Sequence, residues 1–460
     1  MKILLIAVNQ EKHPYPVQPL GAAYIAAALR AKGHEVRIVD LCFVEDFQKE
    51  LLVNLEGFSP QLIGFSIRNI DNTSFPNTKY YLPGIKKIVD FCKENTDAYL
   101  IVGGSGLSVM PKEVLQYLGL NIGVVGEGED TLYKIVEKID QKRDIRDTKG
   151  IVYFEDDTYI ENKVDYTKNR VDKLFPDRDL LDVKRYMAEG SITNVQTKRG
   201  CGFKCIYCTY PIIEGEKIRL RSPRSVATEI EMLNKRYGID YFYFIDSIFN
   251  FPIDHAMEIC EEIIKKGLKI KWTAFFHPKF ITKELAALLV ESGCSGVEFG
   301  IDSASERILE NLKKGFFVKE VIKASSICKK AGLNVCCYLL IGGPGENRES
   351  LKETFDVMED ISPTAIIAQS GVRIYPGTEI EKIAVAEGYD LENYLPPKFY
   401  ISRELKDNLV KVIREFIPNH PNFIYEGLGE EIPVEILKRM RKMGIKGPLW
   451  ELKGKAEVQS

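Results

Sequence analysis

Three cysteines lie close together near the middle of the chain, at Cys201, Cys205 and Cys208, in a C-x3-C-x2-C spacing with Tyr207 just before the last. Thiolates are soft ligands that select iron–sulfur clusters, zinc or copper(I). A short loop can place three thiolates on three irons of a cubane cluster, which leaves the fourth iron without a protein ligand. An open iron can chelate a substrate, so this spacing indicates a catalytic cluster rather than an electron carrier.

A zinc knuckle and a coincidental spacing are the alternatives for this loop. A structural zinc site needs a fourth ligand. The nearest downstream histidines are His255 and His277, and neither falls in a zinc-finger spacing. The cysteine loop therefore favours the cluster.

A strand–helix rhythm follows the cysteine loop and predicts a partial (β/α)6 barrel over residues 190–390. In barrels of this kind the chemistry collects at the carboxyl ends of the strands. The strand-like segments are 241–246, 271–276, 296–300, 335–341 and 365–368. The candidates at or near their ends are Glu298, Ser303, Gly342 and Gly343, with Asp246 and Thr273 as further possibilities.

The first 140 residues alternate apolar strands with helices, which predicts a doubly wound parallel sheet. Ligands of such sheets bind beyond the carboxyl ends of the strands. Three strand ends carry glycines or polar residues that suit a ligand: Ser66-Ile67-Arg68-Asn69, Gly103-Gly104-Ser105-Gly106 and Gly126-Glu127-Gly128-Glu129. Any one of these segments taken alone is better explained as an ordinary tight turn of an α/β fold.

Two further regions complete the chain. Residues 141–189 are polar and contain a small hairpin near Asp156-Asp157, so we interpret them as an ordered connector. Residues 391–460 predict a small, mostly helical domain with helices over 402–416 and 433–443. This domain either packs over the open side of the barrel and helps to form a substrate pocket, or simply caps it.

Length and charge restrict the class of protein. The chain has 460 residues and a net charge of −3, so two or three domains are expected and a polyanionic partner such as nucleic acid is not. The seven other cysteines are scattered through apolar or helical contexts, and no apolar run approaches the ~18 residues of a membrane-spanning helix. We expect a soluble, reduced, cytoplasmic protein.

The cysteine loop resembles the signature of the radical S-adenosylmethionine (SAM) superfamily. The resemblance implies a [4Fe-4S] cluster on Cys201, Cys205 and Cys208, with the amino and carboxylate groups of SAM on the open iron. It also implies that Tyr207 lies against the adenine. The strand-end residues expected to contact SAM are Glu298, Ser303, Gly342 and Gly343.

The three strand ends of the first domain resemble, in order and spacing, the cobalamin-binding domain of many class B radical SAM methylases. The resemblance implies that the cobalamin contacts are Ser66, Arg68, Asn69, Gly103, Gly104, Ser105, Gly126, Glu127 and Gly128. The chain lacks the D-x-H-x-x-G motif that supplies a histidine to cobalt in other cobalamin proteins, and His13 and His34 do not fit it. Cobalamin is thus expected without histidine on cobalt, with Arg68 near the lower corrin face.

Together the two resemblances imply a cobalamin-dependent radical SAM methyltransferase. Such an enzyme moves a methyl group from SAM through methylcobalamin to a substrate carbon, after a 5′-deoxyadenosyl radical has removed hydrogen from it. Cyclisation and polar C-methylation are alternatives, and so is a methylthiotransferase, although only Cys42 and Cys92 precede the loop where that class would need three cysteines. The expected partners are a small-molecule or peptide substrate and a flavodoxin- or ferredoxin-type electron donor, and the expected state is a monomer.

Overall fold

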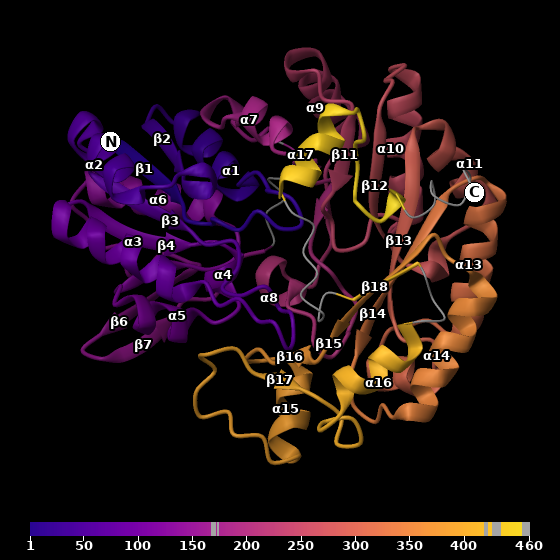
Figure 1. Ribbon diagram of the computed structural model, residues 1–460. Helices are drawn as coiled ribbons and strands as arrows, with labels where there is room; N and C mark the ends of the chain where they lie inside the picture. The colour runs from indigo at the N-terminus through magenta and orange to yellow at the C-terminus, as the bar shows by residue number, and fades with distance from the viewer. Residues whose placement is uncertain (167–171, 173, 418–421, 426–433, 453–460) are drawn as a thin grey trace. The chain divides into compact units, whose positions relative to one another are not determined.

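The computed structural model describes residues 1–166, 172, 174–417, 422–425 and 434–452, of which 434–437 are described by their backbone alone. Contacts divide the chain into two units (Figure 1). The first contains Met1–Asn72, Lys79–Ser191 and Thr209–Lys217, and the second contains Thr73–Thr78, Ile192–Cys208 and Ile218–Ser460. The connector predicted over 141–189 lies within the first unit.

The first unit is built on a seven-stranded sheet of order β2-β1-β3-β4-β5-β6-β7. The first five strands are parallel, and β6 and β7 are the predicted hairpin, which adds antiparallel to β5. The strands are β1 (Lys2–Ala7), β2 (Glu35–Asp40), β3 (Leu62–Ser66), β4 (Tyr99–Gly103), β5 (Ile122–Val124), β6 (Ile151–Glu155) and β7 (Thr158–Glu161).

Helices cover both faces of this sheet, as the continuous apolar strands predict. On one face α1 packs against α6, and on the other α3 packs against α2 and α5 (Figure 1). The core between the sheet and the α1 and α6 face includes Ile3, Leu29, Leu62 and Ile135. The helices are α1 (Leu20–Arg30), α2 (Phe47–Phe58), α3 (Leu82–Asn95), α4 (Ser105–Ser108), α5 (Pro111–Leu118), α6 (Gly128–Asp140), α7 (Val183–Ala188) and α8 (Tyr210–Glu214). The predicted doubly wound fold is confirmed.

The second unit is built on an all-parallel sheet of order β18-β15-β14-β13-β12-β11-β8. Its strands are β8 (Thr193–Val195), β11 (Tyr241–Phe244), β12 (Lys271–Phe276), β13 (Cys294–Asp302), β14 (Asn334–Ile341), β15 (Ala365–Ser370) and β18 (Phe423–Tyr425). Two small antiparallel pairs accompany it, β9 (Lys198–Arg199) with β10 (Arg219–Leu220), and β16 (Val372–Arg373) with β17 (Phe399–Tyr400). The predicted partial barrel is formed by six strands of this sheet: β8, β11, β12, β13, β14 and β15.

Helices run along the outer side of this sheet (Figure 1). They are α9 (Pro223–Tyr237), α10 (Ile253–Lys265), α11 (Lys283–Glu291), α13 (Val318–Lys330) and α14 (Arg348–Ile361), and the unit also contains α12 (Glu306–Asn311), α15 (Glu379–Ala386), α16 (Leu409–Phe416) and α17 (Val434–Lys442). On the outward row of strand side chains, residues such as Phe242, Trp272 and Phe299 are buried under these helices. Several residues of the inward row keep partial exposure: Tyr243, Phe275, Gly300, Tyr338, Leu340, Ile367 and Gln369. The inner face therefore retains access for a ligand.

The carboxyl-terminal region differs in part from the prediction. The helix expected from Ser402 begins only at Leu409, because Ser402 binds the strand end after β14: its N–H donates to Gly342 O (2.9 Å) and its hydroxyl to Glu346 O (2.5 Å). The second predicted helix is α17, and Pro433 lies outside the described residues.

Candidate active site

The three strand ends predicted to bind cobalamin lie at one edge of the first sheet. The parallel register pairs Ser66 of β3 with Gly103 of β4, and Gly103 with Val124 of β5, just before Gly126. The N–H of Ile67 extends this pairing to Gly103 O at 2.9 Å. The site residues predicted for cobalamin are thus gathered at the carboxyl edge, where ligands of doubly wound sheets bind.

Glycine at position 104 permits a close approach of two backbones at this edge. Gly104 has φ +100°, and a Cβ there would lie 2.4 Å from Ile67 O. Next to it, the Ser105 hydroxyl donates to Arg68 O at 2.5 Å. The Gly103-Gly104-Ser105 segment therefore holds the backbone that carries Arg68, and no side chain larger than hydrogen fits at 104.

Arg68 is half-buried beside the polar side chains of Glu11, Tyr81, Cys42 and Tyr186, and burial lowers the pKa of its guanidinium. Its Nε donates to Asn69 Oδ1 at a long 3.4 Å. Within the ranges that the structure describes, Arg68 forms no close ion pair, so a surface salt bridge does not account for this arginine.

The Gly126-Glu127-Gly128 segment is held by its own neighbours. The N–H of Gly126 donates to the Ser108 hydroxyl at 2.9 Å. The phenol of Tyr166 packs where Cβ atoms of Gly126 and Gly215 would stand, and its hydroxyl donates to Ile212 O at 2.6 Å. One aromatic side chain therefore contacts both this strand end and α8, the helix that follows the cysteine loop in sequence.

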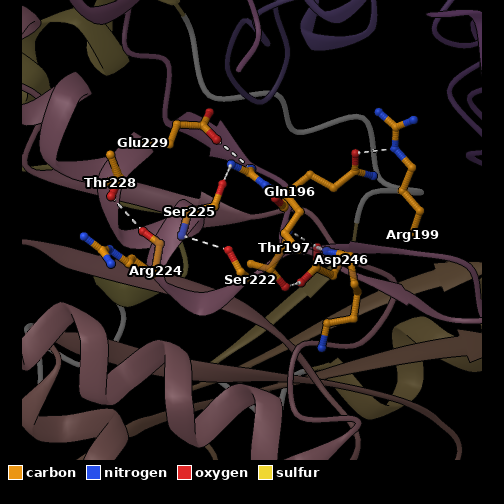
Figure 2. Close-up of polar contacts among 11 residues, drawn as sticks. Gln196, Thr197, Arg199, Ser222, Arg224, Ser225, Thr228, Glu229 and Asp246 are labelled. Carbon is orange, nitrogen blue, oxygen red and sulfur yellow. Dashed lines mark hydrogen bonds and ion pairs between the residues drawn. The ribbon is translucent and has the colours of Figure 1, made fainter. Parts of the chain in front are cut away.

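The residues that lead into the cysteine loop are fixed by Asp246 at the end of β11. Its carboxylate accepts from the backbone N–H of Thr197 at 2.7 Å, from the N–H of Lys198 at 3.2 Å and from the Thr197 hydroxyl (Figure 2). Lys198 is buried, and its Nζ donates to the carbonyls of Phe249 (2.5 Å) and Phe251 (3.0 Å). Burial lowers the pKa of Lys198 to about 8 and raises that of Asp246. Asp246 acts here as a structural anchor.

A buried ion pair supports the same segment. Arg221 donates from one nitrogen to Glu229 at 2.6 Å and to Gln196 O at 2.7 Å, and Arg199 donates to Gln196 Oε1 at 2.9 Å (Figure 2). The short β9 and β10 pair joins Arg199 with Arg219. The entry to the cysteine loop is therefore held by hydrogen bonds from several sides.

The three cysteines lie in the irregular loop that follows β9. Cys201 is buried, Cys205 and Cys208 are half-buried, and the N–H of Cys208 donates to Cys205 O at 3.1 Å to close a turn. In the described part of the chain, no three Cys, His, Asp or Glu side chains converge as a preformed metal site. The soft donor set, the spacing and the closed turn fit an iron–sulfur cluster, and these ligands stay a prediction.

A charged triangle, not foreseen from the sequence, adjoins this loop. Tyr207 donates its hydroxyl to Asp302 Oδ2, and Lys314 Nζ lies 2.6 Å from the same oxygen and 3.1 Å from the Tyr207 hydroxyl. Asp302 ends β13 with a left-handed φ of +66°. The Tyr207 ring, expected against adenine, is therefore oriented through its hydroxyl.

Glu298 lies on the inner face of β13 and is completely buried. Tyr243 donates to one carboxylate oxygen at 2.7 Å and Trp450 to the other at 3.0 Å, and Tyr338 is a third donor. Burial raises the pKa of Glu298 to about 7, while these donors lower it. Its expected contact with SAM stays a prediction.

The remaining SAM candidates lie at neighbouring strand ends. Ser303 is buried, and its hydroxyl lies 3.0 Å from that of Thr354. Gly342 has φ +105°, and the N–H groups of Gly342 and Gly343 both donate to Glu346 Oε2, the second at 3.2 Å. Burial raises the pKa of Glu346 to about 7. Thr273, a further candidate, donates its hydroxyl to Gly296 O at 3.0 Å.

Trp450 anchors the end of the described chain beneath Glu298. A Cβ at Gly296 would lie 2.7 Å from the Trp450 ring, and the adjacent Glu451 accepts from Ser295 at 2.6 Å. Ser295 and Gly296 stand near the amino end of β13, so this segment packs against the amino-terminal half of the strand and reaches Glu298.

We expect Trp450→Phe to lower the free energy of unfolding by about 1–3 kcal/mol, because it leaves a buried Glu298 oxygen without a donor. The loss should be larger at pH 8 than at pH 6. Burial raises the pKa of Glu298 to about 7, so the carboxylate is ionised at pH 8, and a hydrogen bond to the ionised form stabilises it more than one to the neutral form. Urea unfolding at both pH values measures it. Met443→Ala, at a position 68% exposed in the same tail, should change neither value. An equal loss at both pH values would contradict the role given to the indole N–H.

Comparison with known proteins identifies a known family in each of the two parts of the chain. Residues 7–136 match the B12 binding domain family, and residues 195–358 match the radical SAM superfamily. The uncharacterized methyltransferase PH0819 of Pyrococcus horikoshii is 30% identical over 395 residues, covering 84% of this chain and 83% of its own length. The chain belongs to the cobalamin-dependent radical SAM enzymes. Its cofactors are therefore a [4Fe-4S] cluster, SAM and cobalamin.

Other proteins are similar to most of this chain in sequence or in fold. The tryptophan 2-C-methyltransferase of Streptomyces laurentii is 24% identical, covering 84% of this chain and 75% of its own length. The solved structure of the radical SAM methyltransferase TsrM from Kitasatospora setae, with cobalamin and a [4Fe-4S] cluster bound, superposes with a TM-score of 0.87 at 23% identity, covering 99% of this chain and 98% of that one. No helix among the described residues is long and apolar enough to cross a membrane.

Proposed function

We propose that this chain is a C-methyltransferase that transfers a methyl group from SAM, by way of cobalamin, to a carbon atom of a small-molecule substrate. The observation that carries the proposal is the pairing, in one chain, of a cobalamin-type sheet edge with a three-cysteine loop at the carboxyl ends of a partial barrel. When bound, cobalamin supplies a transferable methyl group, and the cluster supplies the electron that cleaves SAM.

Different residues would hold the cluster and the cobalamin. Cys201, Cys205 and Cys208 would hold the cluster, and the glycine backbone at 103–104 would lie against the corrin. Arg68 would stand by the lower corrin face, where a guanidinium carries a permanent charge and cannot coordinate cobalt. It would thereby disfavour a ligand on that face.

SAM would lie on the inner face of the second unit's sheet. Tyr207 would contact the adenine, and the backbone at Gly342 and Gly343 is fixed by Glu346 beside it. Glu298 and Ser303 would contribute from β13 and the turn after it. The buried donors around Glu298 and Ser303 favour a preorganised site, because their rotamers are already held.

The substrate class rests on the relatives. One methylates tryptophan and another, from Streptomyces wedmorensis, cytidylyl-2-hydroxyethylphosphonate, so a small molecule is the class that they share. We further propose a monomer that works in the cytoplasm with a flavodoxin- or ferredoxin-type donor. The ten free cysteines are in keeping with a reducing compartment.

Methyl-deuterated SAM tests the proposal without knowledge of the substrate. The chain is purified anaerobically, loaded with cobalamin and cluster, and incubated with labelled SAM and a low-potential reductant. We expect deuterated methyl on the corrin fraction by mass spectrometry. Absence of label there contradicts the proposal. Formation of 5′-deoxyadenosine in the same sample supports the radical route, whereas label without it favours polar C-methylation or cleavage that waits for substrate.

A further inference from the structure

The charged triangle of Lys314, Asp302 and Tyr207 is buried more deeply than a simple surface ion pair. Lys314 and Asp302 are each only 7% exposed, and they lie 2.6 Å apart. Burying two charges is costly, and breaking such a pair by removing one partner leaves the other uncompensated. A pair of this kind next to a predicted cofactor loop calls for a role beyond stability.

The backbone ties this pair to the cysteine loop. The N–H of Ile206, between Cys205 and Tyr207, donates to Leu312 O at 3.3 Å, just ahead of Lys314. Ile206 packs with Leu312 in one buried cluster, and its own carbonyl accepts from Ile380 at 3.0 Å. The segment that carries Lys314 is therefore docked on the turn that carries two of the three cysteines.

Hydrogen bonds place the Lys314 ammonium next to the side chain of Tyr207, which belongs to this turn. Lys314 Nζ lies 3.1 Å from the Tyr207 hydroxyl and 5.6 Å from the centre of its ring. Tyr207 directly precedes Cys208. Asp302, which ends β13 with a left-handed φ of +66°, pairs with the ammonium at 2.6 Å through the same oxygen that accepts from the Tyr207 hydroxyl.

The cation and the anion act on the thiols with opposite sign. A nearby cation stabilises a thiolate and a nearby anion destabilises it, and both Lys314 and Asp302 interact electrostatically with Cys205. Lys314 also interacts with Cys208.

We propose that Lys314 and Asp302 are positioning residues that set the reduction potential of the cluster, Lys314 raising it and Asp302 lowering it. The inference rests on the proposed function, since it needs the cluster on these cysteines. Reduction adds one electron from a low-potential donor and therefore one negative charge at the cluster, with no proton transferred. A nearby cation stabilises that added charge and a nearby anion opposes it.

The test is an anaerobic redox titration of the reconstituted cluster followed by electron paramagnetic resonance. Lys314→Met should shift the reduction equilibrium toward the oxidised cluster by on the order of tenfold, about 59 mV for one electron. Asp302→Asn should shift it in the opposite direction, and Lys314→Arg should stay near the wild type. A purely structural role predicts no such reversal of sign between the partners of one pair.

The control is Lys352→Met, which breaks an exposed pair with Asp356 on α14 and should leave the potential unchanged. Unchanged potentials in Lys314→Met and Asp302→Asn overturn the inference, as does loss of SAM binding in Lys314→Met at an unchanged potential. If the Lys314→Met variant does not fold, an unchanged or lowered reduction potential in Asp302→Asn is sufficient by itself to overturn the inference. A wild-type chain that takes up no cluster overturns the proposed function, and this inference with it.

Discussion

Cys201→Ala should abolish cluster assembly and all SAM cleavage, leaving no turnover above background. Two thiolates remain in that variant, and the open iron that chelates SAM is formed only when the cluster is held. Cobalamin binding should persist, because its predicted residues belong to the first unit. Iron content, the visible spectrum and the yield of 5′-deoxyadenosine measure these effects.

Cys260→Ala is the matched control for this substitution. Cys260 is fully buried in α10, where a thiol acts as a small hydrophobic side chain, so its loss should leave iron content unchanged. Full iron content and full turnover in Cys201→Ala would overturn the assignment of the loop as the cluster site.

Gly104→Ala should weaken cobalamin binding by on the order of 10- to 100-fold, because small displacements of a positioning segment carry costs of that size. The new Cβ would lie 2.4 Å from Ile67 O, so the strand end that carries Arg68 has to move. Titration of the variant with cobalamin, followed by its spectrum, gives the affinity. The cluster should assemble as in the wild type.

Gly33→Ala separates this steric effect from backbone strain. Gly33 has a similarly positive φ of +86°, but a Cβ there would meet nothing within 4 Å. It should cost some stability, since a left-handed conformation costs non-glycine residues roughly 1–2 kcal/mol, while cobalamin affinity stays unchanged. Equal affinities in Gly104→Ala and the wild type would refute the placement of cobalamin at this edge.

The sequence predicted both sheets and the meeting of Ser66, Gly103 and Gly126 at one edge. This worked because buried parallel strands are continuous apolar runs, and because parallel strands end at a common edge. The short strands β8 and β18, with three residues each, carry too little periodicity to be found.

Other features depend on tertiary contacts that no local pattern encodes. Tyr207 is hydrogen-bonded to Asp302, which lies 95 residues away in the sequence, and Trp450 is hydrogen-bonded to Glu298, which lies 152 residues away. Glu298 lies on the inner face of β13 and its contact with SAM stays a prediction, whereas its aromatic donors, which come from β11, β14 and the chain's last described segment, had no signal in the local sequence. Ser402 likewise lies outside the helix predicted for it, because it forms hydrogen bonds with Gly342 and Glu346 after β14.

The metal content of the anaerobically loaded chain tests the central claim most directly. One sample, freed of unbound cofactors, is analysed for iron, cobalt and protein. The account predicts about four irons per chain, as in a [4Fe-4S] cluster, together with equimolar cobalt in a corrin spectrum. Iron without cobalt would mean that the edge formed by Ser66, Gly103 and Gly126 does not bind cobalamin, and the methyltransferase mechanism would fail with it.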